Sequence, residues 1–295
     1  MIPITKRLAK GSNLFANHQP LAQPVDLAHS RTLMARTTEE WGTKRGAAQK
    51  VARFWEVDAA RGVAIIMMVV YHTTYDLDAL GGYDVDATSG SWAVFADVTA
   101  GLFLFLVGVS LAISRSRTSL SGWRLFGKYL ARGLRIIAYG MILTGIFLAL
   151  QMGVVAFGIL HLIGVSIILA YPFLKLRVTN LVLGLIIFVA GQYVLAQDYI
   201  SETYWLLPFG VVPEGLIMPD YRPLLPWFGV VLIGLFFGNV IYADGHRPAG
   251  LPDRAPLGAR SLLPLGRNSL FIYLIHQPIV IALLALTGII SLNIL

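Results

Sequence analysis

The sequence predicts an all-α membrane protein, a polytopic bundle of about seven transmembrane helices with its N-terminus in the cytoplasm. The chain is 56% hydrophobic and only 13% charged, with a mean hydropathy of +0.70. This balance is typical of polytopic membrane proteins and excludes a soluble globular domain. Apolar stretches of about 20 residues, the length that crosses a bilayer core, recur along the chain. The Lys and Arg residues gather between alternate stretches, which gives the orientation.

Seven stretches have the length and hydropathy of a membrane span. They are about 59–78, 93–113, 133–151, 154–174, 178–197, 223–242 and 269–290. The third and fourth are almost contiguous, so we expect them to form a tight helical hairpin. The segment 201–220 contains three prolines and cannot span. We expect it to be an outer loop that dips against the bundle through Tyr204, Trp205 and Phe209.

Charge sets the orientation of these spans. With the N-terminus inside, the inner segments hold 22 of the 23 Lys and Arg residues, and only Arg222 falls outside. Such a separation follows the positive-inside rule. The outer segments carry the acidic residues Asp84, Asp86, Asp198, Glu202, Glu214 and Asp220. The net charge of +7 therefore indicates topology first and contact with anionic lipids second, rather than a nucleic-acid partner.

The chain divides into two parts. Residues 1–52 are mixed polar and basic and lack the apolar region of a secretory signal, so we expect a disordered basic cytoplasmic tail. Met34 is an alternative start, and residues 37–56 are a candidate short interfacial helix. Residues 53–295 form the membrane domain.

The first span carries ionisable side chains at membrane depth. The apolar helix Val57–Asp78 has Asp58 and Arg61 at its entry and His72 and Asp76 deep inside. Ionisable groups in hydrocarbon are costly, so they are functional candidates. At a rise of about 1.5 Å per residue, His72 lies roughly 20 Å past the inner end, and Asp76, four residues on, shares its face. A carboxylate placed there orients the imidazole and stabilises its protonated form, as a general base requires.

Other polar residues are expected at a similar depth. Asp97 lies near the outer end of the second span, His161 in the outer half of the fourth, and Arg222 at the outer start of the sixth. We expect His72, Asp76, Asp97 and His161 to share one polar pocket below the outer surface, faced by Arg222.

Each of these residues also has a structural interpretation. His72 suits a packing histidine that is hydrogen-bonded to a neighbouring helix, Asp97 a counter-charge that fixes helix packing, and His161 a structural or substrate-contacting group. No metal site is expected, because no close ligand spacing such as HExxH occurs. The chain has no Cys, which excludes thiol catalysis and disulfides.

The inner surface is strongly basic. Asp58 and Arg61 lie three residues apart, which suits a local ion pair at the start of a helix. The second inner loop carries Arg115, Arg117, Arg124, Lys128, Arg132 and Arg135. Positive-inside anchoring explains this cluster, and the functional alternative is a docking surface for an anionic donor such as the phosphates of coenzyme A. No Walker-type or GxGxxG loop occurs, so nucleotide hydrolysis is unsupported.

The last span begins with the segment LGRNSLFIYLIHQPIV. Asn268 and Ser269 are candidate caps for its first turn. His276 is expected about two turns into the helix, in its inner half and away from the layer of His72. An interhelical hydrogen bond is its expected role.

Four segments carry a family resemblance. They read VDAARGVAIIMMVVYH, SWAVFADVTAGLFLFLVGVSLAISRSR, FGILHLIGVSIILAYPF and LGRNSLFIYLIHQP. Together they resemble the heparan-alpha-glucosaminide N-acetyltransferase catalytic-domain family of prokaryotic membrane proteins, from about residue 54 to residue 290. The first and last also resemble the broader acyltransferase-3 superfamily, in which an Arg-Gly is followed by a His near the far end of the first helix.

The resemblance implies a transmembrane acyltransferase domain over residues 53–295. A cytoplasmic acyl-CoA such as acetyl-CoA would be the co-substrate, with no tightly bound cofactor, and an acceptor hydroxyl or amine, often on a sugar, would receive the acyl group. The proposed catalytic His of the acyltransferase-3 relatives corresponds to His72. In the heparan-type enzymes the catalytic His instead precedes the Ser-Trp that matches Ser91 and Trp92, and Ser89 is the nearest residue here.

Three other positions match the family. Asn268 and His276 correspond to the Asn and His of its last helix. His161 stands where the heparan enzymes tend to carry Gln, which implies a hydrogen-bonding role.

The expected function is acyl transfer in the plasma membrane. His72, oriented by Asp76 or Asp97, would take the proton of the acceptor, and His161 or Arg222 would stabilise the oxyanion. An acyl-imidazole on His72 is a second route. The residues expected to bind coenzyme A are Arg61, Arg115, Arg117, Arg132 and Arg135.

The expected partners are the lipid bilayer, the acyl-CoA and a sugar or glycoconjugate acceptor, without nucleic acid, and a homodimer is left open. Two other functions compete with acyl transfer. A proton-coupled transporter or flippase would use the same buried ionisable groups as a relay. A membrane scaffold would use them only to hold helices together.

Overall fold

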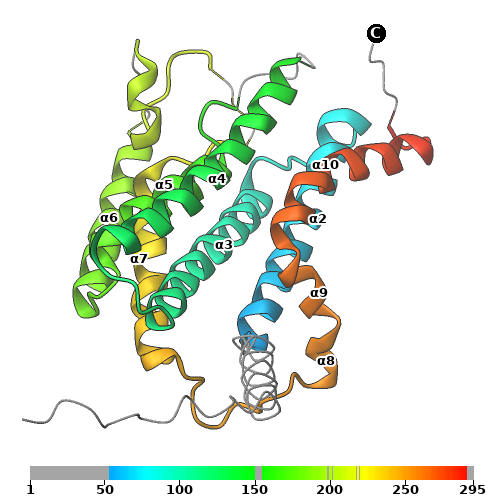
Figure 1. Cartoon of the computed structure of the whole chain (residues 1–295). Helices are drawn as coiled ribbons and strands as arrows, with labels where there is room; N and C mark the ends of the chain where they lie inside the picture. The colour runs from blue at the N-terminus through cyan, green and yellow to red at the C-terminus, as the bar shows by residue number, and fades with distance from the viewer. Residues whose placement is uncertain are drawn as a thin grey trace, which may run out of the picture. The chain divides into compact units, whose positions relative to one another are not determined.

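The structure is a computed structural model that describes residues 53–149, 155–197, 199, 200, 202–216, 218 and 220–290, with the side chain of Asp244 excepted (Figure 1). The expected cytoplasmic tail, the alternative start at Met34 and the connection between the third and fourth spans lie outside these residues. So does most of the candidate interfacial helix at 37–56.

The described residues form the predicted all-α membrane fold. Six helices are long and apolar enough to cross a membrane, and they are α2 (Trp55–Gly81), α3 (Gly90–Ser116), α4 (Gly122–Ala149), α6 (Val178–Leu195), α7 (Leu224–Ile241) and α10 (Ser269–Leu286). The fourth predicted span is shorter than expected. It consists of α5 (Ile159–Leu169), entered through non-helical residues 155–158 and followed by a 3-10 turn, η1 (Tyr171–Phe173). Pro172 in that turn cannot donate the backbone hydrogen bond that would continue α5.

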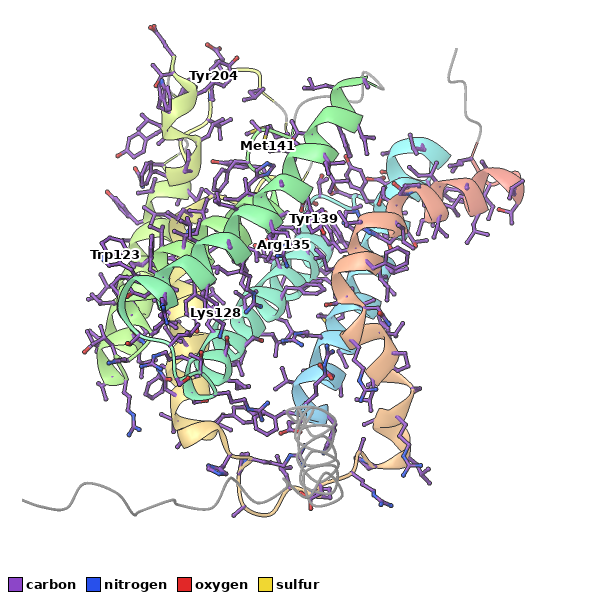
Figure 2. All side chains as sticks on the ribbon, in the orientation of Figure 1. Trp123, Lys128, Arg135, Tyr139, Met141 and Tyr204 are labelled. Atoms are coloured by element: carbon purple, nitrogen blue, oxygen red, sulfur yellow. The ribbon has the colours of Figure 1, made fainter. Side chains whose placement is uncertain are left out.

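Helix α4 begins well before the predicted start at residue 133. The positive φ of Gly122, +52°, makes the turn into the helix, and no helix breaker follows it. Lys128 and Arg135 therefore project from a helix rather than from an inner loop (Figure 2). Long cationic side chains on a membrane helix reach the interface along their apolar stems. Trp123, at the start of α4, is 85% exposed and suits the same interface.

Helices α3 and α7 form the centre of the bundle. Their packing is the most extensive between any two described helices, and the buried core there includes Leu104, Leu111, Val231, Leu232 and Leu235. Glycines allow the two backbones to meet, a common device between membrane helices. A Cβ on Gly108 would lie 2.1 Å from the carbonyl oxygen of Val231, and one on Gly234 would lie 2.1 Å from that of Phe105.

The other helices pack around this pair in three groups. α6 packs on α7, and α4 packs on α5. The last segment of the chain contains α8 (Leu257–Arg260) and α9 (Leu262–Arg267), which lead into α10. α9 and α10 both pack on α2, which also contacts α3 (Figure 1). The α4–α5 pair and the α2–α9–α10 group therefore flank α3.

The outer loop contacts the bundle through a different residue from those predicted. Its 3-10 helix η2 (Tyr204–Phe209) exposes 65% of Tyr204, 87% of Trp205 and 48% of Phe209. Leu207 is buried instead, and its carbonyl oxygen accepts a hydrogen bond from the hydroxyl of Tyr221 at 2.6 Å. The expectation for the three aromatic residues was wrong, because they face outward, as interfacial aromatic residues do.

The close contact of α3 and α7 gives a test of the fold. We expect Gly108→Ala to lower the free energy of unfolding by about 1–3 kcal/mol, because the added methyl group forces two backbones apart. The matched control is Gly145→Ala in α4, where a Cβ meets no atom within 4 Å. That variant should change stability by less than about 1 kcal/mol. Unfolding of the purified proteins in detergent measures both, and equal stabilities would contradict the packing described.

Candidate active site

A cavity of about 590 Å³ lies among α2, α3, α4, α5, α9 and α10. Six arginines line it, Arg53, Arg61, Arg117, Arg132, Arg135 and Arg267, and Asp58 is the one acidic residue in the described wall. Most of the remaining wall is apolar, with Leu106, Val107, Ile136, Ile159 and Ile163 among its residues. A basic cavity with apolar walls suits an anionic ligand that also carries an uncharged arm.

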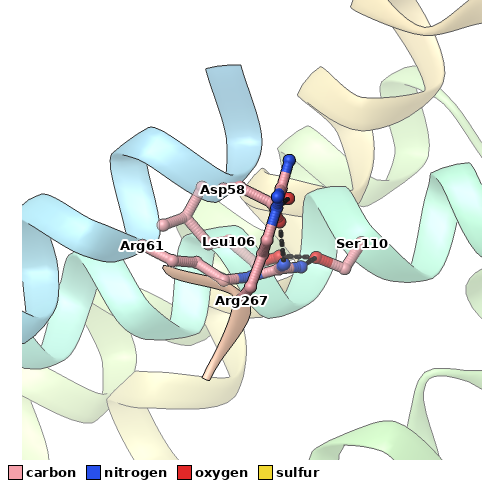
Figure 3. A network of polar contacts seen from close by, with 5 residues as sticks. All are labelled: Asp58, Arg61, Leu106, Ser110 and Arg267. Atoms are coloured by element: carbon pink, nitrogen blue, oxygen red, sulfur yellow. Dashed lines mark hydrogen bonds and ion pairs between the residues drawn. The ribbon is translucent and has the colours of Figure 1, made fainter. Parts of the chain in front are cut away.

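Asp58 joins three helices at this cavity (Figure 3). Nη1 of Arg61 lies 3.1 Å from one carboxylate oxygen, and Nε of Arg267 lies 3.4 Å from the other. Nη2 of Arg61 donates to the hydroxyl of Ser110, which donates in turn to the carbonyl oxygen of Leu106. The predicted pair of Asp58 and Arg61 is therefore present, and Arg267 extends it to α9.

The backbone at α9 approaches Asp58 closely. A Cβ on Gly266 would lie only 1.7 Å from the carbonyl oxygen of Asp58. Asp58 itself is 3% exposed and is shared by two guanidinium groups. In the described chain no carboxylate pairs with Arg132 or Arg135, so the cavity keeps an excess of positive charge.

Aromatic and charged side chains tie the inner ends of α2, α3 and α7 together. The guanidinium of Arg117 lies 4.0 Å from the ring centroid of Phe54, whose ring stacks on Tyr242 at 4.8 Å. Arg247 pairs with Glu56 at 3.2 Å. Burial, together with the positive charge of Arg247, lowers the pKa of Arg117. Burial and the nearby charge of Glu56 raise the pKa of the Tyr242 hydroxyl.

Tyr273 of α10 lines the cavity, and its hydroxyl leads toward the outer loop. It donates to Oδ2 of Asp220 at 2.7 Å, and the backbone N–H of Ile159 donates to the same oxygen at 3.3 Å. Asp220 has a φ of +58°, a strained value for a residue other than glycine. Such a strained backbone persists only where surrounding contacts hold it, and here the hydrogen bonds from Tyr273 and Ile159 hold the carboxylate of Asp220.

The segments 155–159 and 220–222 hold each other in place beside Tyr273. Gly158 and Tyr221 form an isolated antiparallel bridge, and the N–H of Arg222 donates to the carbonyl oxygen of Phe157 at 3.3 Å. Burial raises the pKa of Tyr221 to about 12. The sequence did not single out Tyr273 or Asp220. Asp220 was interpreted only as an acidic residue of the outer loop. Tyr273 could have been named as a candidate, because it lies three residues before His276 and therefore shares its helical face.

His72 and His276 lie together, contrary to the sequence-based expectation. Their ring centroids are 4.8 Å apart, and the ring of His276 lies 5.7 Å from that of Tyr273. Nδ1 of His276 lies 2.7 Å from the carbonyl oxygen of Tyr273, so it carries the proton, because a carbonyl only accepts. Nε2 of His276 therefore presents a lone pair, and in the described chain this buried atom has no hydrogen-bond partner.

The error in the depth of His276 comes from how α10 pairs with α2. The expectation counted His276 from the start of α10, as if that point were level with the start of α2. In the structure α10 packs on α2 so that Gln277 bonds to Asp76 and His276 lies beside His72. The pairing of the two helices, and not the count from the first residue of α10, therefore sets the level of His276.

Asp76 bonds to α10 rather than to His72. Its Oδ1 accepts a hydrogen bond from Nε2 of Gln277 at 2.6 Å, and Asp76 is 2% exposed. The other carboxylate oxygen and Oε1 of Gln277 are buried without partners among the described residues. The cluster of His72, Asp76, His276 and Gln277 therefore keeps several unused polar atoms between α2 and α10. Tyr273 is the cavity-lining residue nearest to it in sequence, and neither histidine is part of the cavity wall.

The expected pocket shared by four residues is not formed. Asp97 pairs with Arg222 at 2.9 Å, and their side chains are 53% and 24% exposed. Arg222 remains in electrostatic range of His72. His161 points elsewhere, because its ring packs against Gly140 of α4. Nδ1 of His161 accepts from the N–H of Gly158 at 3.3 Å and Nε2 lies 3.4 Å from the sulfur of Met141, so both ring nitrogens are engaged.

Two further predicted residues lie outside the cavity wall. The side chain of Asn268 makes no cap bond to α10 and donates instead to the carbonyl oxygen of Pro264 in α9, at 2.9 Å. Arg115 lines a second, smaller pocket. The other four arginines expected to bind coenzyme A line the main cavity, and the sequence missed Arg53 and Arg267 beside them.

The shared carboxylate gives a stability test. We expect Asp58→Asn to lower the free energy of unfolding by about 1–3 kcal/mol, because two guanidinium groups lose their charged acceptor. Asp97→Asn is the matched control, since its ion pair is solvent-exposed and should contribute no more than about 1 kcal/mol. Denaturation in detergent measures the free energy of unfolding of both variants. If Asp97→Asn were destabilised more than Asp58→Asn, the role given to Asp58 would be wrong.

Comparison with known proteins gives one match. Residues 53–278 match the family model described as "Heparan-alpha-glucosaminide N-acetyltransferase, catalytic". No curated protein and no solved structure gives a match.

Proposed function

The chain belongs to the heparan-alpha-glucosaminide N-acetyltransferase catalytic family, and we propose that it transfers an acetyl or other acyl group from cytoplasmic acyl-CoA to an acceptor hydroxyl or amine. The family and the six apolar helices make it a multi-pass membrane acetyltransferase. One observation carries the finer proposal. The 590 Å³ cavity has arginines in its wall, and it includes Tyr273, whose ring contacts the buried His276, which in turn lies beside His72.

The arginines of the cavity suit the phosphates of coenzyme A. Guanidinium groups bind phosphate oxygens in a bidentate manner, and their charge is not neutralised at Arg132 and Arg135. The apolar wall formed by Leu106, Ile136 and Ile163 suits the uncharged pantetheine arm. A donor bound by its phosphates to the arginines would direct its thioester toward Tyr273.

The histidine pair supplies the acid–base chemistry. As the acceptor oxygen or nitrogen attacks the thioester carbonyl carbon, it loses a proton, and the C–S bond then breaks to release the coenzyme A thiolate. We assign His72 as the group that takes this proton, with His276 between it and Tyr273. The hydroxyl of Tyr273 or the charge of Arg222 would stabilise the oxyanion. Direct attack and an acyl-imidazole on His72 are both compatible with this arrangement.

The acceptor would approach from the outer side. The ion pair of Asp97 and Arg222 is accessible there, and Asp220 connects the outer loop to the hydroxyl of Tyr273. Carboxylate and guanidinium groups bind hydroxyl and amine groups, so a sugar or glycoconjugate is the proposed acceptor. The proposed membrane is the plasma membrane.

A transporter remains the competing function, and the buried cluster of His72, Asp76 and His276 is the observation that favours it. Such a row of ionisable groups suits a proton relay. The two functions differ in a simple way, because a transporter moves its substrate in vesicles that contain no acyl-CoA.

The donor site is tested by removing its unpaired arginines. We expect Arg132→Gln and Arg135→Gln each to raise the KM for acetyl-CoA about tenfold or more with little change in kcat, because each removes a charge-assisted hydrogen bond to phosphate. Arg260→Gln is the control, since this exposed inner arginine lies outside the cavity wall. Transfer of labelled acetyl groups by reconstituted protein measures both constants, and unchanged KM values would refute the donor site.

The role of His72 is tested separately. We expect His72→Ala to lower kcat by about 100-fold or more while the KM for acetyl-CoA stays close to its original value, because the proton acceptor is lost and the donor arginines remain. His246→Ala, at an exposed histidine after α7, should leave both constants unchanged. Full activity in His72→Ala would remove His72 from the mechanism.

A further inference from the structure

A second pocket, of about 210 Å³, lies at the inner ends of the helices that form the other side of the bundle. The end of α3, the segment between η1 and α6, and the end of α7 form its wall. The lining residues are Arg115, Ser116, Leu174, Lys175, Arg177, Asn239, Tyr242 and Ala243. None of them lines the main cavity. The pocket is therefore separate from the proposed donor site.

The charge of this pocket is not balanced within the described chain. Arg115, Lys175 and Arg177 are cationic, and none of the described wall residues is acidic. Nη1 of Arg115 donates to the carbonyl oxygen of Thr118 at 3.3 Å, while its Nε is enclosed and lacks a partner among the described residues. Guanidinium and ammonium groups that have no carboxylate in the described wall favour an anionic ligand.

The backbone that carries the cations is held rigidly. Nδ2 of Asn239 in α7 donates to the carbonyl oxygen of Leu176 at 3.0 Å. Nδ2 of Asn180, a fully buried residue of α6, donates to the same oxygen at 2.6 Å and to that of Phe173 at 2.9 Å. Two asparagines from different helices thus fix the segment of Lys175 and Arg177. Such preorganisation lowers the entropic cost of binding a ligand.

Exposed aliphatic side chains lie next in sequence to the residues of this pocket. Leu176, just before α6, and Val178, its first residue, are 36% and 66% exposed. Val240 and Ile241, at the end of α7, are 52% and 42% exposed. α6 and α7 pack against each other, so these side chains offer an apolar surface beside the cations.

We propose that this pocket binds the phosphate of an anionic phospholipid of the inner leaflet, with the acyl chains along the exposed ends of α6 and α7. The cations lie at the inner ends of membrane helices, where such headgroups are found. Topological anchoring alone requires only that basic residues lie on this side. It does not explain a pocket with three cations and no acidic residue in its described wall, or a cationic segment held by two asparagines.

The test compares two pairs of exposed inner cations. The pocket variant is Lys175→Gln with Arg177→Gln, and the control is Arg254→Gln with Arg260→Gln, which removes the same charge elsewhere. Thermal shifts of the purified protein in neutral detergent give the affinity for short-chain phosphatidylglycerol, with phosphatidylcholine and inorganic phosphate as further arms.

We expect wild type and control to bind phosphatidylglycerol with similar affinity and the pocket variant to bind at least tenfold more weakly. Phosphatidylcholine and inorganic phosphate should give no comparable shift. Equal loss in both variants would mean a general surface-charge effect and would overturn the proposal. If inorganic phosphate alone gave an equal thermal shift, the pocket would be a site for a free anion, and the lipid proposal would be overturned. Arg115→Gln, which removes the third cation of the pocket, should also weaken binding, and unchanged affinity in this variant would remove Arg115 from the site.

Discussion

The carboxylate of Asp58 is the interaction on which the candidate active site depends. It lies at the start of α2 and accepts from Arg61 and Arg267, and Arg61 reaches Ser110 of α3. One buried acid thus holds α2, α9 and α3 in register at the cavity. Because that acid is shared between two arginines, it does not pair with Arg132 or Arg135, whose charge suits an anionic ligand. Further along α2, the hydrogen bond from Gln277 to Asp76 and the contact of His276 with His72 hold α10 against α2.

The polar residues of the membrane interior form a continuous path between helices α2 and α10. The main cavity includes Tyr273, whose ring contacts His276, which in turn contacts His72. On its other side the Tyr273 hydroxyl bonds to Asp220 of the outer loop. A transferase that takes a donor from one side of the membrane and an acceptor from the other requires such a connection. Tyr273 is the residue where the two sides meet.

Hydropathy alone was sufficient to predict the all-α membrane fold, and the orientation inferred from charge stays a prediction. Hydropathy and charge were not sufficient for the ends of helices. The basic residues of α4 indicated a loop, whereas their long side chains allow the helix to continue to Gly122. α9 is too short and too irregular in sequence to be recognised as a helix beside α2, and the pairing of α10 with α2, which places His276 beside His72, has no signal in the sequence.

The site could be predicted only in part for a related reason. A helical face follows from spacing, so His72 and Asp76 could be named as candidates, and the basic inner surface indicated four of the six cavity arginines. Contacts between residues of different helices depend on packing. The sequence therefore could not predict that Asp76 pairs with Gln277, or that His161 lies apart from them beside Gly140. Asp220 could not be predicted for another reason. Its position depends on a strained backbone in a proline-rich loop, and the spacing of residues in a sequence predicts helices and strands but not the conformation of such a loop.

The central claim is that the arginine-lined cavity receives the acyl donor. The most direct measurement is an experimental structure of the protein in a lipid nanodisc with a non-hydrolysable acetyl-CoA analogue bound. We expect the phosphates within hydrogen-bond distance of Arg132 and Arg135 and the acyl group beside Tyr273. A donor bound outside this cavity, or bound with its acyl group directed away from the two histidines, would contradict it.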